Sequence, residues 1–143
     1  MNKLTFYQPK NGKAHSLPLF LTQVKAGFPS PADDFIEKRL DLNELLIRNP
    51  PATYFVRVEG ESMQGANIHS GDILIVDRSI EPADRKIVIA VVNGEFTVKR
   101  FRLLKRGAFL ESENSAFPPI PIPPEADFQI FGVVTYIVHK CTL

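Results

Sequence analysis

Two side chains in the middle of the chain have the types and surroundings that peptide-bond chemistry needs. Ser62 follows Gly60 on an expected turn, and Lys99 lies inside an expected strand at 95–104. A serine hydroxyl is a poor nucleophile unless a base lies within hydrogen-bond reach, and a lysine can be that base if it is kept neutral. The pair predicts a nucleophile with its general base, although a turn serine and a strand-edge lysine would give the same letters.

The alternation of the strand gives a reason for Lys99 to be neutral. Successive side chains point to opposite faces, so Lys99 shares its face with Thr97 and Phe101, while Arg100 and Arg102 point the other way. If the Lys99 face is directed at the core, desolvation disfavours the ammonium and lowers the lysine pKa toward the range of a working base.

The turn at Ser62 can also supply hydrogen-bond donors. The backbone N–H groups of Glu61 and Ser62 are expected to point at a developing oxyanion, and Met63 is expected to pack inward beneath the turn.

A target for this chemistry lies upstream, at Ala26-Gly27. Residues 1–29 carry several prolines and glycines and lack periodicity, which is typical of an arm rather than of an independent fold. Small residues at the two positions let a catalytic centre approach the backbone closely, although a plain linker would also use them. The sequence therefore predicts two parts, a flexible N-terminal arm (1–29) with the cleavage site and a peptidase domain (30–143).

The elements that must position the site are mainly β. Aromatic and β-branched runs separated by turn residues predict strands at 54–58, 72–77, 86–92, 95–104, 108–111 and 128–138. Asn93-Gly94 predicts a type I′ hairpin, and Gly132 a bend in the last strand. Strands this close in sequence favour an antiparallel bent sheet or barrel.

Ahead of these strands the signals are mixed. Residues 30–40 carry helix-start signals, although an extended segment fits nearly as well, and Asp41 can cap a short helix that Pro50-Pro51 ends. The five prolines in 118–124 indicate a stiff surface loop.

Composition excludes several classes of function. The net charge of +1 gives no support for a general nucleic-acid binder, and no apolar run is long enough for a membrane span or a secretory signal, which favours the cytoplasm. The single cysteine, Cys141, leaves no internal disulfide and no thiolate metal cluster. His15, His69 and His139 fit a histidine triad badly, and we expect neither a metal nor a cofactor.

Several short motifs follow one another along the chain. They are Ser62-Met63, Ile68-x-x-Gly71-Asp72, Val76-Asp77 and Phe96-Thr97-Val98-Lys99-Arg100. In order and spacing they resemble the LexA/UmuD family of self-cleaving proteins, peptidase relatives of bacterial signal peptidase. Residues 15–20, 26–32, 52–55 and 131–135 resemble the UmuD and MucA branch, so the resemblance covers about residues 15–139.

The resemblance implies a Ser/Lys dyad on a LexA-type or signal-peptidase-type domain. Ser62 would attack the carbonyl of Ala26, with Lys99 as general base. Proteins of this kind are homodimers whose cleavage is stimulated by RecA filaments on single-stranded DNA after damage. The shortened form then joins a Y-family, UmuC-like polymerase subunit in error-prone translesion synthesis as part of the SOS response.

The chain departs from parts of the family. LexA and phage repressors place a helix-turn-helix before the cleavage site, but 26 residues before Gly27 are too few for one, so no sequence-specific DNA binding is expected. Residues 1–14 match no family pattern.

Two other functions remain open. One is a non-enzymatic interaction module of the same fold, which binds partners through the arm and the proline stretch. The other is a nucleic-acid binder built on the basic and aromatic residues 99–106, although alternation splits their charges between two faces.

Overall fold

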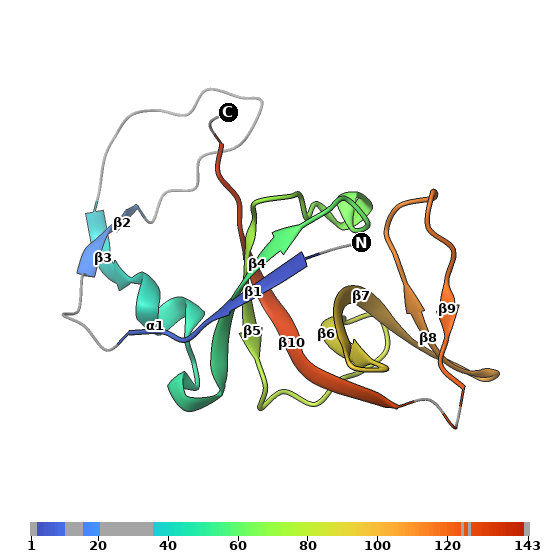
Figure 1. Cartoon of the computed structure of the whole chain (residues 1–143). Coiled ribbons are helices and arrows are strands. Elements are labelled where there is room, and N and C mark those ends of the chain that lie inside the picture. Colours follow the sequence, from blue (N-terminus) through green and yellow to red (C-terminus); the bar gives the residue numbers. More distant parts are fainter. Residues whose placement is uncertain (1–2, 11–15, 21–35, 124, 126, 142–143) are drawn as a thin grey trace. The chain divides into compact units, whose positions relative to one another are not determined.

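The structure is a computed structural model of the chain that describes residues 3–10, 16–20, 36–123, 125 and 127–141 (Figure 1). The chain divides into two compact units. One comprises Met1–Pro9 and Asn49–Leu143, and the other comprises Lys10–Arg48.

The strands described in the larger unit form one antiparallel sheet of eight strands, in the order β1-β4-β5-β10-β6-β7-β8-β9 (Figure 1). They are β1 (Lys3–Tyr7), β4 (Thr53–Glu59), β5 (Ile73–Asp77), β6 (Ile87–Val92), β7 (Glu95–Leu104), β8 (Gly107–Glu111), β9 (Ile120–Pro121) and β10 (Phe128–Val138). Because β1 at the edge contacts β7, the first six strands in this order curl into a partial barrel, and β8 and β9 extend beyond it. The predicted antiparallel bent sheet is confirmed.

The β6–β7 hairpin forms where the sequence predicts it. Asn93 and Gly94 both have positive φ, 49° and 82°, and Val92 pairs with Glu95 across the turn. Both central positions of a type I′ turn require positive φ, which asparagine and glycine tolerate best. The turn thereby fixes the register of β7, the strand that carries Lys99.

Strand β10 is irregular at the predicted bend. Its pairing with β6 shifts register between Ile130 and Gly132. A Cβ at Gly132 would lie 2.6 Å from Cγ1 of Val76, so the close approach of β10 to β5 requires glycine there.

Apolar side chains are buried on both faces of the sheet. Residues inside the curl form one cluster, made of Val56, Val58, Met63, Ile68, Leu74, Val76, Ile89 and Val98. The other face of β6, β7 and β10 forms a second cluster with β8, made of Val88, Ala90, Phe101, Leu110 and Val133. Strand β7 contributes to both, which explains why its centre is buried on both faces.

Strand β1 was not expected. Residues 3–7 pair antiparallel with β4, within the same sheet, in a segment that the sequence interpretation assigned to an arm. The compact units are thus drawn differently from the predicted division at residue 29, although residues 21–35 lie outside the described part of the chain.

In the smaller unit, β2 (Ser16–Phe20) pairs antiparallel with β3 (Ile36–Asp41), which leads into helix α1 (Leu42–Leu46). A helix that continues to Leu40 is therefore wrong, and the extended alternative fits, because β2 offers residues 36–41 a pairing partner. The predicted cap of α1 is confirmed, since the Asn43 N–H donates to the Asp41 carboxylate at 2.9 Å.

Two short 3₁₀ helices, η1 (Pro50–Ala52) and η2 (Gln64–Ala66), flank β4. Within the expected proline loop, Ile120 and Pro121 form the exposed edge strand β9 against β8. The Ile122 N–H also donates to the Ala108 carbonyl at 3.1 Å, so this part of the loop is tied to the sheet.

Candidate active site

Ser62 lies on a tight turn between the end of β4 and η2. Gly60 enters the turn with φ 111°, and the Gln64 N–H donates to the Glu61 carbonyl at 3.3 Å. Ser62 is only 2% exposed. Met63 is equally buried and belongs to the cluster inside the curl, which confirms its predicted packing beneath the turn. The turn therefore holds the serine against the sheet.

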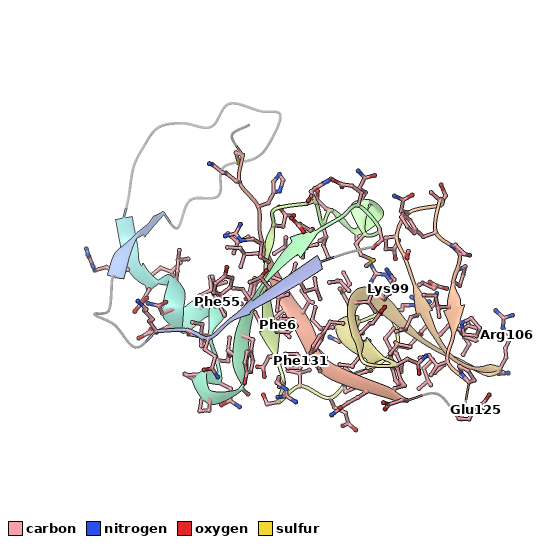
Figure 2. All side chains as sticks on the ribbon, in the orientation of Figure 1. Phe6, Phe55, Lys99, Arg106, Glu125 and Phe131 are labelled. Atoms are coloured by element: carbon pink, nitrogen blue, oxygen red, sulfur yellow. The ribbon has the colours of Figure 1, made fainter. Side chains whose placement is uncertain are left out.

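Lys99 (Figure 2) stands at the centre of β7 and pairs with Val88 of β6. Its side chain is on the face of Phe101, as alternation predicts, and is 6% exposed, so the condition for a lowered pKa is met. Lys99 Nζ lies 3.1 Å from Ser62 Oγ, within hydrogen-bond distance. The structure thus brings together the two residues that the sequence singled out, which are 37 positions apart.

Burial controls the charge of this lysine. Removal of the amine from water disfavours the ammonium form and lowers the pKa of Lys99. A neutral amine in contact with a hydroxyl can accept its proton, whereas an ammonium cannot. The arrangement can therefore generate a serine alkoxide as the hydroxyl attacks a carbonyl carbon.

Two residues between β8 and β9 hold the serine turn, and the sequence interpretation missed both. Asn114 Nδ2 donates to the Glu61 carbonyl at 2.9 Å, and the Glu113 carbonyl accepts from the Gly65 N–H at 2.5 Å. A Cβ at Gly65 would lie 2.5 Å from the Glu113 oxygen, so the approach depends on glycine. We call Glu113 and Asn114 the loop clamp.

The loop clamp is also tied to the strand of Lys99. Arg100 Nε donates to the Glu113 carboxylate, and Arg100 Nη1 donates to the Arg85 carbonyl at 2.6 Å. Asn114 is fixed at its other end, since its Oδ1 accepts from the Ala116 N–H at 3.0 Å. An Asn-Ser pair is a common turn signal, but nothing in the sequence says which distant carbonyl its amide reaches.

The backbone of Glu61 and Ser62 is the predicted oxyanion site. Two donors fix the Glu61 carbonyl, from Gln64 and from Asn114. Because a trans peptide is planar, this also fixes the direction of the Ser62 N–H. The oxyanion role itself stays a prediction.

The histidines form a separate group. His139 Nδ1 lies 2.7 Å from Asp72 Oδ1, and Asp72 Oδ2 accepts from the His69 N–H at 2.8 Å. The two imidazole rings lie 5.4 Å apart, and His69 Nδ1 is 4.0 Å from a Glu61 carboxylate oxygen. Sequence reasoning found no acid for His69 because Glu61 reaches it only through the fold.

Two predicted features, the cleavage site Ala26-Gly27 and His15, lie outside the residues that the structure describes. In the part that is described, no cluster of three or more His, Cys, Asp or Glu side chains is arranged to hold a metal ion. No helix there is long and apolar enough to cross a membrane.

The basic stretch 99–106 does not present a row of unpaired cations. Lys99 is buried, and Arg100 pairs with Glu113. Arg102 donates to Asp84 at 3.0 Å and to Glu111 at 3.3 Å. Burial and these pairings account for three of the five basic residues in this stretch, and Lys105 and Arg106 are exposed.

Comparison with known proteins agrees with the fold and with the motifs. Residues 18–135 match the family described as Peptidase S24-like. The chain is 51% identical to Protein SamA of Salmonella typhimurium strain LT2 over 123 residues, 86% of this chain and 85% of that protein. It is 44% identical to Protein MucA of Escherichia coli, over 87% of this chain and 85% of that protein.

A more distant relative is LexA repressor 1 of Geobacter sulfurreducens, 39% identical over 80% of this chain and 56% of that protein. The resemblance to the UmuD and MucA branch of the LexA/UmuD family is confirmed. The chain belongs to the Peptidase S24-like family.

Proposed function

We propose that this protein is a serine endopeptidase that cleaves its own Ala26-Gly27 bond, with Ser62 as nucleophile and Lys99 as general base. The contact of 3.1 Å between Ser62 Oγ and Lys99 Nζ carries the proposal. Both residues are buried, and burial lowers the pKa of Lys99, which is the condition under which a lysine can act as base.

Ser62, Lys99, the Ala26-Gly27 peptide and one water molecule account for every bond that forms or breaks. Ser62 Oγ attacks the carbonyl carbon of Ala26 as its proton passes to Lys99 Nζ. The oxyanion that forms accepts hydrogen bonds from the backbone N–H groups of Glu61 and Ser62. The C–N bond then breaks, the Gly27 nitrogen takes the proton from the Lys99 ammonium, and water hydrolyses the Ala26 ester on Ser62.

Docking of the Ala26-Gly27 segment beside Ser62 and Lys99 is the step that can be regulated. Holding the scissile peptide beside the dyad makes the reaction effectively unimolecular, so a modest base suffices. We infer that RecA filaments on single-stranded DNA shift the population toward the docked state.

Membership of the family supports a cellular context for this reaction. We infer that the protein is a cytoplasmic homodimer of the SOS response. Its shortened form would serve as accessory subunit of a Y-family, UmuC-like translesion polymerase. Similarity to SamA and MucA supports this role.

The intact mass of the chain after incubation with RecA, ATP and single-stranded DNA tests the proposal. We expect loss of residues 1–26. Ser62→Ala and Lys99→Ala are each expected to slow this loss by at least about 1,000-fold, because the two residues act as a unit. Ser115→Ala and Lys105→Ala, at exposed positions of the same residue types, are matched controls that retain the wild-type rate.

A chain that stays intact under these conditions would contradict self-cleavage. It would favour the alternative of a non-enzymatic interaction module with the same fold.

A further inference from the structure

Strand β1 pairs with the edge of the sheet in the way that a bound peptide would, although it belongs to the same chain. It pairs with β4 over five residues, from Lys3 opposite Glu59 to Tyr7 opposite Phe55. β1 stands at the end of the strand order, and β5 is the other neighbour of β4. Without β1, the sheet would therefore end at β4 with unpaired N–H and C=O groups.

The surface that β1 covers accepts apolar side chains at alternate positions of the strand. Leu4 and Phe6 pack against the cluster inside the curl, whereas Thr5 and Tyr7 are exposed. The Phe6 ring lies 4.7 Å from the ring of Phe96 and 5.0 Å, edge-on, from that of Phe131. Figure 2 labels Phe6 and Phe131. We call Phe96, Phe131 and the β4 edge the β1 seat.

The proposed cleavage would remove the covalent link between β1 and the rest of the chain. Residues 3–7 precede Ala26-Gly27 in the chain, so the cut turns an intramolecular pairing into a bimolecular one. A tethered segment has an effective concentration of about millimolar, which exceeds micromolar protein by about 1,000-fold. A five-residue strand makes few contacts, so we expect the released fragment to dissociate at micromolar protein concentration.

We propose that cleavage opens the β1 seat to an extended segment of a partner protein, which adds to β4 as a strand and places an aromatic side chain where Phe6 was. This inference rests on the proposed self-cleavage for its use in the cell. Strand addition gives affinity through main-chain hydrogen bonds and specificity through pockets for alternate side chains, and β1 shows both at this edge.

A segment with an aromatic residue fits the seat better than a second copy of this chain. Two β4 strands paired edge to edge would satisfy the backbone but would leave the Phe6 position empty. Phe96 is already 43% exposed with β1 in place, so an unfilled position would leave further aromatic surface in water. A segment with an aromatic residue both pairs with the β4 backbone and fills the Phe6 position.

The test uses the folded chain with Ser62→Ala and a recognition sequence for a specific protease inserted between Ala26 and Gly27. Cutting this protein opens the seat without self-cleavage. The probe is a fluorescent peptide of residues 1–10, and its anisotropy reports binding. We expect the peptide to bind the cut protein at least 10-fold more tightly than the uncut protein, in which the covalent β1 competes.

Matched peptides test the specificity of the seat. Phe6→Ala in the peptide is expected to weaken binding at least 10-fold, whereas Thr5→Ala, at the exposed neighbour, changes it less than about 3-fold. If cutting unfolds the protein, as judged by circular dichroism, the uncut chain with Phe6→Asp is used instead. A charge between the two rings should release β1 and open the seat to the same peptide.

Three results would overturn the inference. They are equal binding to cut and uncut protein, retention of the released fragment at micromolar concentration, and dimerisation of the cut protein through β4 with no peptide binding. Failure of the unmodified chain to self-cleave would refute the proposed function instead, and the binding result would stand independently.

Discussion

At the scale of single residues, burial of the Lys99 amine couples the chemistry to pH. The proposed base works only in its neutral form, and the pKa of Lys99 is lowered by burial. Below that pKa the spontaneous cleavage rate should rise about tenfold per pH unit, because the neutral fraction rises by that factor, and it should level off above it. Rates measured without RecA across neutral to alkaline pH give the profile. A flat profile would count against Lys99 as the base.

The same burial predicts a pH-dependent stability. Because the folded pKa of Lys99 is lower than the unfolded value of about 10.4, the unfolded state binds more protons between these two values. Stability of the native chain therefore rises with pH across this window, and the cost of the lysine is largest below it.

Replacement of the buried amine should remove this cost. We expect Lys99→Met to raise the melting temperature at neutral pH, and the difference should shrink as pH approaches about 10.4. Thermal unfolding in a pH series measures it, with the exposed Lys105→Met as control. Equal stabilisation at every pH would mean that packing, rather than charge, causes the effect.

At the scale of elements, the loop clamp joins the serine turn to β7. Asn114→Ser keeps a side-chain acceptor for the Ala116 N–H but is too short to reach the Glu61 carbonyl. Direct loss of one oxyanion donor costs about 100-fold to 1,000-fold in rate, so a looser turn should slow cleavage by about tenfold or more. The pH midpoint should stay in place, because the burial of Lys99 does not change. Cleavage rates in a pH series measure both, and an unchanged rate would show that Asn114 serves only its own turn.

The approach of Glu113 to Gly65 makes a separate prediction. Gly65→Ala would place a Cβ 2.5 Å from a backbone oxygen, which forces the loops apart. We expect a loss of about 1 to 3 kcal/mol in unfolding free energy together with slower cleavage. Urea denaturation measures the first, and Gln64→Ala, exposed on the same η2, is the control.

Elements were predictable from sequence where their signals are local. The β6–β7 hairpin follows from Asn93-Gly94, and alternation along β7 places Lys99 on the same face as Phe101. β1 and β2 were missed, and β3 was left open between helix and extended chain, because these short, mixed sequences become strands only through partners elsewhere in the chain. The loop clamp was missed for the same reason, since Asn114 and Glu61 are 53 positions apart.

At the scale of the whole sheet, β1 closes the curl by reaching β7 through Phe6 and Phe96. Phe6→Ala in the uncut chain should lower the unfolding free energy by about 1 to 2 kcal/mol, because part of a large apolar side chain returns to water. Urea denaturation measures the loss. Thr5→Ala, at the exposed position beside it, should change stability by less than about 0.5 kcal/mol. Equal effects of the two substitutions would mean that β1 does not hold the curl through its inward face.

The place of β10 in the sheet has a consequence for timing during synthesis. β10 lies between β5 and β6, so it joins the strands on the Ser62 side to those on the Lys99 side, and it is made after all of them. The sheet cannot be completed on the ribosome until this strand has emerged, because pairings so distant in sequence form late. A growing chain therefore carries the serine and the lysine without the sheet that brings them together, so the proposed self-cleavage is expected to begin only after β10 has joined the sheet.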